Sequence, residues 1–124
     1  DLLAHEGNAA LTGERATLLA IGRHLRLPSG CKIVVGRNEQ ENNYLMNCGV
    51  RGFLLTTGKL PGPTTLMPGA PTREEIELTA RITAGYSDGK EEPGVPVEVR
   101  ERGKQDRRLI VKPMMREKIG EFMV

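Results

Sequence analysis

Alternation between apolar and polar side chains marks the first predicted elements. Residues 21–27 alternate in this way, although Arg23 interrupts the apolar face. Residues 31–35 end in a β-branched run, which is typical of a strand. The Pro-Ser-Gly sequence at 28–30 suits the turn between the two segments. The pattern therefore predicts a β-hairpin over residues 21–35.

Two capping patterns predict the main helices. Asn38 precedes Glu41 by three residues, as in a capping box, and the helix that follows is expected to end near residue 47. Thr72 and Glu75 have the same spacing and start a second helix, which is expected to end near residue 86.

Four further strands complete the predicted fold, over 53–56, 64–67, 95–100 and 107–112, with the last two paired as a hairpin around Gly103. The order β-β-α-β-β-α-β-β contains no long parallel βαβ repeat. It predicts an α+β fold in which two main helices pack on a mixed, mostly antiparallel sheet. Residues 1–20 are interpreted as a helical lead-in to a domain over 21–124, and the start at Asp1 suggests a piece of a longer protein.

Composition narrows the class of protein. A chain of 124 residues and 13.6 kDa suits one domain. Aromatic residues make up only 3% of the chain, so we expect an aliphatic core and no row of rings on which successive bases would stack. No apolar run approaches the ~18 residues of a membrane span, and no secretory signal is recognisable, so the sequence predicts a cytoplasmic protein without a membrane partner.

Charge is unevenly distributed along the chain. The formal net charge is +2, but residues 100–118 contain eight basic and three acidic residues, a local net of +5. Such a segment fits a solvated hairpin, and it also fits a surface that contacts phosphates.

Motifs of catalysis are missing from the sequence. The two histidines stand apart from each other, and there is no nucleophile elbow, phosphate-binding loop or metal-ligand spacing. We therefore expect no catalytic residue, no metal and no cofactor in this chain. Cys31 and Cys48 lie in apolar segments and are interpreted as buried, reduced thiols; a sulfur-carrier role for either one is the alternative.

Two segments are candidates for binding. At 35–42 a strand runs through a glycine into a helix N-terminus, where free amides and Arg37 would attract an anion. At 59–63 a stiff loop with two prolines carries Lys59. The alternative interpretation is ordinary helix capping in the first segment and a simple turn in the second.

Taken in order, three segments resemble the NFACT RNA-binding domain. They are 32–45, which contains Gly36-Arg37-Asn38 and Asn42, 60–64, which contains Pro61-Gly62, and 80–88, which contains Tyr86-Ser87. The segment at 21–28 is similar to the linker strand of the copies that are appended to PP-loop tRNA thiouridine synthases. The sequence departs from the ribosome quality-control members at 52–57, where it lacks their acidic-aromatic-His stretch.

This resemblance implies an RNA-binding accessory domain, without catalytic activity of its own, in a thiouridylase-like tRNA sulfur-modification protein that is an ATP-dependent enzyme as a whole. It implies that residues 1–20 end a preceding PP-loop enzyme domain, that RNA, and tRNA in particular, is the partner, and that DNA is not. Arg37 at the helix start is expected to contribute more than Arg107 or Arg108. The residues expected to contact RNA are Arg37, Asn38, Asn42, Lys59, Pro61, Gly62, Tyr86, Arg100, Arg102, Arg107 and Arg108.

Two other functions remain open at this point. A protein-interaction module would dock onto its own enzyme domain or onto a partner, and its binding would tolerate salt. A sulfur-relay protein would need an accessible, reactive thiol at Cys31 or Cys48.

Overall fold

The computed structural model describes residues 21–101 and 104–123. The predicted lead-in at 1–20, together with Arg102 and Gly103, lies outside the described residues. The elements in chain order are β1 (Arg23–Arg26), β2 (Lys32–Val35), α2 (Glu39–Asn47), β3 (Gly52–Thr56), β4 (Thr65–Pro68), α3 (Arg73–Gly85), β5 (Val95–Glu101), β6 (Arg107–Val111) and α4 (Arg116–Gly120).

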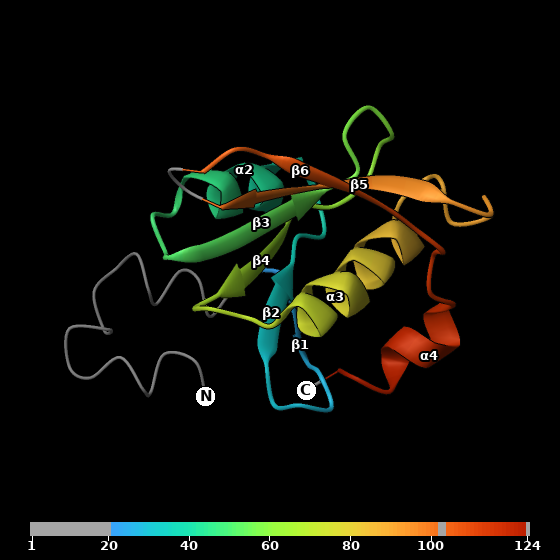
Figure 1. Ribbon diagram of the computed structural model, residues 1–124, viewed down its shortest axis with the longest axis horizontal. Helices are drawn as coiled ribbons and strands as arrows, with labels where there is room; N and C mark the ends of the chain where they lie inside the picture. Colours follow the sequence, from blue (N-terminus) through green and yellow to red (C-terminus); the bar gives the residue numbers. More distant parts are fainter. Residues whose placement is uncertain (1–20, 102–103, 124) are drawn as a thin grey trace.

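The strands form one six-stranded sheet with the order β1-β2-β4-β3-β5-β6 (Figure 1). Every neighbouring pair in it is antiparallel, and the two predicted hairpins, β1–β2 and β5–β6, are both present. The α+β fold is therefore confirmed, and none of the parallel pairing that a mixed sheet would include occurs among the described strands.

One face of the sheet is covered by α3, which lies diagonally across it (Figure 1). The helix starts with the predicted capping box: the backbone N–H of Glu75 donates to Thr72 Oγ1, and the backbone N–H of Thr72 donates to Glu75 Oε1. Alternate residues of β5, Val95, Val97 and Val99, are buried beneath the helices of this face and form part of the main core. The capping pattern predicts where α3 begins, and the strand alternation predicts which side of β5 faces the core, so both are consistent with α3 on this face.

The opposite face carries α2, which packs through Leu45 and Cys48 on Val34 of β2 and Leu66 of β4. With nine residues this helix is only ~14 Å long, whereas six strands span about 24 Å. Much of β3, β5 and β6 is therefore left without a helix on this face. That uncovered area is where the candidate site lies.

The C-terminal helix α4 was not predicted, because its five residues are too few to show a period. The segment after it returns to β1: the backbone N–H of Arg26 donates to the carbonyl of Phe122 at 2.8 Å, and Leu25 forms an antiparallel bridge with Met123. This contact covers the outer edge of β1.

Candidate functional site

The Gly-Arg-Asn segment is joined to the start of β4. The backbone N–H of Gly36 donates to the carbonyl of Thr64 at 3.0 Å, and the backbone N–H of Thr64 donates to Asn42 Oδ1 at 3.0 Å. A side chain at position 36 would overlap Asn42 Oδ1, so this close approach requires glycine. Asn42 therefore positions the turn, whichever ligand the surface binds.

The Pro-Gly loop is joined to the end of α3. The backbone N–H of Asp88 donates to the carbonyl of Pro61 at 2.8 Å, and Thr57 Oγ1 donates to the carbonyl of Leu60 at 2.8 Å. A Cβ at Gly62 would lie 2.8 Å from Ser87 Cβ, closer than packed carbon atoms approach. The three segments that carry the family resemblance are thus linked to one another in space, through Thr64 and through Ser87.

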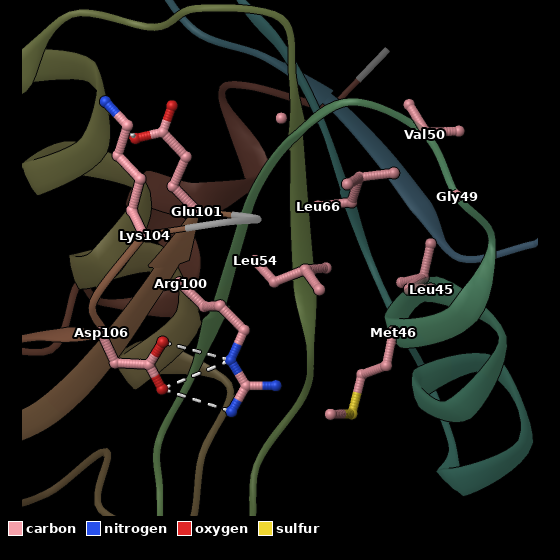
Figure 2. Close-up of a pocket in the computed structure, with 11 residues that line it drawn as sticks. Leu45, Met46, Gly49, Val50, Leu54, Leu66, Arg100, Glu101, Lys104 and Asp106 are labelled. Atoms are coloured by element: carbon pink, nitrogen blue, oxygen red, sulfur yellow. Dashed lines mark hydrogen bonds and ion pairs between the residues drawn. The ribbon is translucent and has the colours of Figure 1, made fainter.

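A groove runs along the uncovered sheet face between α2 and strands β3, β5 and β6. It consists of two hollows of about 490 and 670 Å³ that share Met46 and Arg100. Figure 2 shows Met46 of α2 and Arg100 of β5 reaching into the first hollow from opposite sides, beside Leu54. Both volumes fall within the range of small-molecule sites, ~300–1,000 Å³.

Strand register explains why these side chains share a face. Val34, Leu66, Leu54 and Arg100 occupy directly paired positions on β2, β4, β3 and β5. Paired residues point to the same side of a sheet. Because α2 covers only the first two, Leu54 is half-buried and Arg100 is exposed.

Charges along the groove are balanced. Arg100 pairs with Asp106 at 3.3 Å, and Arg108 pairs with Glu98 at 3.7 Å. Exposed ion pairs of this kind contribute only about 0–1 kcal/mol, so a phosphate can replace the carboxylate at little cost. The charged side chains that line the groove are the cations Lys59, Arg100, Lys104 and Arg108 and the anions Glu39, Glu98, Glu101 and Asp106.

Lys59 differs from the other cations of the groove, because it forms no ion pair with any residue that the structure describes. It lies on the exposed loop at the end of the larger hollow, where Thr56 adds a hydroxyl group and Asn43 an amide group. This end of the groove therefore offers a cation and hydrogen-bonding groups to a sugar-phosphate backbone.

The guanidinium group of Arg37 is directed toward the Glu41 carboxylate and is held there. The guanidinium donates from Nε to Glu41 Oε1 at 3.0 Å and from Nη2 to Oε2 at 2.7 Å, and the backbone N–H of Arg37 also donates to Oε1. Asn38 caps α2 as predicted, accepting from the backbone N–H of Glu41 at 2.9 Å. The reciprocal half of the predicted capping box is replaced by these Arg37 contacts.

Glu41, the acid of the predicted capping box, is also the partner of Arg37, and the sequence did not indicate this second role. Its side chain is buried, and the hydrogen bonds from Arg37 lower the pKa of its carboxyl group from 4.5 to about 2. At neutral pH the charge of Arg37 is therefore neutralised by the Glu41 carboxylate, and Arg37 is not a free cation. In the sequence, a glutamate in the first turn of a helix indicates only ordinary capping, and nothing there indicates a pair with Arg37.

Tyr86 lies at the end of α3, away from the groove lining. The guanidinium groups of Arg23 and Arg116 make cation–π contacts with its ring, and their Cζ atoms lie 4.7 and 4.4 Å from the ring centroid. A base that stacked on Tyr86 would have to share the ring with these cations.

The remaining site predictions divide between the two sides of the sheet. Arg107 is paired with Val99, which is buried on the α3 side, so Arg107 does not line the groove with Arg108. Arg102 lies outside the described residues. The predicted residues that line the groove are Asn42, Lys59, Gly62, Arg100 and Arg108, with Pro61 beside them in the loop.

The two thiols have different surroundings. Cys48 is buried under α2, as expected, whereas Cys31 is only half-buried. Burial and the nearby Glu75 carboxylate raise the pKa of the Cys31 thiol, which opposes thiolate chemistry at neutral pH.

Neither a metal-binding cluster nor a membrane-spanning helix is present among the described residues. No cluster of three or more histidine, cysteine or acidic side chains with metal-binding geometry occurs in residues 21–101 and 104–123. None of the helices described there has the length and apolar character to cross a membrane.

Comparison with known proteins finds a matching sequence family and similar solved structures. The sequence model of the NFACT protein RNA binding domain matches residues 22–123. The C-terminal part of the fibronectin/fibrinogen-binding protein from Streptococcus suis has a similar structure, with a TM-score of 0.74 and 18% identity over 84% of this chain. This chain spans about half, 49%, of that structure, and at such low identity the likeness concerns the fold alone. No curated protein matches the chain.

Proposed function

This chain belongs to the NFACT RNA-binding domain family, and on that premise we propose that it binds tRNA as an accessory domain of a thiouridylase-like sulfur-modification protein. RNA binding is the role that the family match supports. The choice of tRNA and of an attached PP-loop enzyme domain rests on the resemblance of residues 21–28 to the linker strand of the copies fused to such enzymes. The proposed cytoplasmic location rests on the sequence pattern alone.

The groove is the observation that supports a specific interface. It brings Lys59, Arg100 and Arg108 from three separate segments to one uncovered sheet face. Hydroxyl and amide groups between them are suited to the phosphates of a nucleic acid and to the 2′-hydroxyl groups that distinguish RNA from DNA. Recognition in this groove depends on the position of the backbone more than on base sequence.

The decisive experiment is a titration of the whole 124-residue chain with tRNA at several salt concentrations. Each phosphate contact contributes a slope of about −0.7 to −0.9 in log affinity against log salt. Lys59→Ala and Arg108→Ala are each expected to lower the affinity and to reduce that slope by about one contact.

Arg73→Ala is the matched control, because Arg73 is also an exposed cation but lies on α3, across the sheet from the groove. It is expected to bind tRNA as the parent does. Failure to bind tRNA, or an affinity that salt does not change, would remove the proposal and favour the protein-interaction module.

A further inference from the structure

One side of the smaller hollow is apolar, which contact with phosphates alone does not explain. Met46 is 40% exposed there although it lies on a packed helix, and Leu54 and Val50 are half-buried beside it. The charges around this surface cancel, as described above. A duplex would present phosphates, sugars and base edges to it, while the flat faces of its bases stay stacked inside the helix.

An unstacked base is a ligand that fits this surface. Its flat face would bury the apolar area, and a methionine sulfur packs favourably against aromatic rings. Arg100 stands at the opposite side of the same hollow, where its guanidinium can donate to the edge of a base or lie against its face. Asp106 holds that guanidinium through hydrogen bonds of 3.3 Å from Nε and Nη2.

We propose that Met46, Leu54 and Arg100 form a nucleobase subsite, so that the groove binds a single-stranded segment of RNA and not a stem. The inference rests on the proposed RNA-binding function and adds the part of the RNA that is recognised. The backbone crosses Lys59 and Arg108 in the larger hollow, and one base turns into the smaller hollow against Met46. At this one position Met46 provides the packing that an aromatic ring provides in other proteins that bind single strands.

Comparing the affinities of three ligands distinguishes this proposal from simple phosphate binding. They are a short single-stranded RNA, the same strand annealed to its complement, and the same strand with abasic nucleotides. The parent chain is expected to bind the first more tightly than the other two. Met46→Ala is expected to weaken binding of the single strand by about threefold to tenfold and to leave the duplex and the abasic strand unchanged.

Met115→Ala is the matched control, since Met115 is 70% exposed and lies next to α4, away from the groove. Because Met46 is also partly exposed, its truncation should leave the melting temperature unchanged, and that measurement excludes unfolding as the cause. Equal binding of all three ligands by the parent, with no effect of Met46→Ala, would overturn the subsite and leave RNA binding intact. Failure of the parent to bind any of the three would overturn RNA binding itself.

A second measurement reads the contact directly. The chain has five methionines, so isotope labelling of their methyl groups would give an NMR spectrum of only a few signals. A base against Met46 shifts its methyl resonance through the ring current, whereas the Met115 methyl stays in place. An unchanged Met46 signal with bound single-stranded RNA, or the same shift with the abasic strand, would contradict the proposal.

Discussion

The Arg37 guanidinium and the Glu41 carboxylate form a two-point ion pair, with Nε–Oε1 and Nη2–Oε2 distances of 3.0 and 2.7 Å. The carboxylate is buried and the guanidinium is half-exposed, so the pair closes the first turn of α2 against the preceding loop. Its presence changes what is expected of both residues.

Glu41 should make the fold sensitive to acid. Its pKa is lowered to about 2 in the folded chain from about 4.5 when unfolded, so its stabilising effect is complete above pH ~4.5 and disappears as the pH falls toward 2. Glu41→Gln is expected to cost about 1–3 kcal/mol at pH 7 and to flatten the fall in unfolding free energy between pH 5 and 2. Denaturant titrations across that range measure both effects.

Glu39→Gln serves as the control for Glu41→Gln, because Glu39 is an exposed acid in the same first turn. It should leave most of the pH dependence in place. An identical pH profile for Glu41→Gln and the parent would show that Arg37 does not hold this carboxylate in solution.

Arg37 should contribute less to RNA affinity than the sequence suggests. Its charge is already neutralised by Glu41, while Lys59 has no ion pair among the described residues. Lys59→Ala is therefore expected to lower tRNA affinity and the salt slope more than Arg37→Ala does. The same salt series measures both variants, and a larger loss for Arg37→Ala would reverse the assignment of the main phosphate contact.

Gly36→Ala should destabilise the chain. The new Cβ would overlap Asn42 Oδ1, so the hydrogen bond from the Thr64 N–H would be displaced and that N–H left unsatisfied, at a cost of about 1–3 kcal/mol. Thermal unfolding should show a lower midpoint for Gly36→Ala. Gly120→Ala is the matched control, because a Cβ there meets no atom within 4 Å; equal midpoints for the two variants would contradict the close approach.

Cys31 should react slowly with a thiol reagent at neutral pH. Its pKa is raised by burial and by Glu75, so its thiolate fraction is below that of free cysteine. Native titration should therefore show slow labelling at Cys31, and Cys31→Ser should remove it. Labelling faster than that of free cysteine would revive the sulfur-relay function.

The fold could be predicted from the sequence wherever the signal was local. Thr72 and Glu75 form the predicted capping box, and alternation along 95–100 gave the buried face of β5. Asn38 and Glu41 have the same spacing, but the chain path through Gly36 brings Arg37 to the carboxylate first. Spacing alone does not show which donor a glutamate will meet.

The groove could not be predicted, because it depends on strand order. Met46 and Leu54 have the same pattern as residues of a core, and nothing near them in the sequence marks them as exposed. Leu54 is only half-buried because β3 lies beside β5 and beyond the part of the sheet that α2 covers. Met46 lies on α2 and is 40% exposed beside that uncovered area. The sequence did identify Lys59 and Arg108, which line the groove, as cations on a loop and on a hairpin.

The hydrogen bond from Asp88 to Pro61 and the close packing of Gly62 on Ser87 fix the Lys59 loop during folding. Ordering one residue of a free chain costs about 1–2 kcal/mol of conformational entropy, so a loop that became ordered only on binding would lose several kcal/mol of affinity. In this chain that entropy is lost before a ligand arrives. Association therefore requires no prior closure of the loop. Differences in affinity among ligands should appear mainly in their dissociation rates.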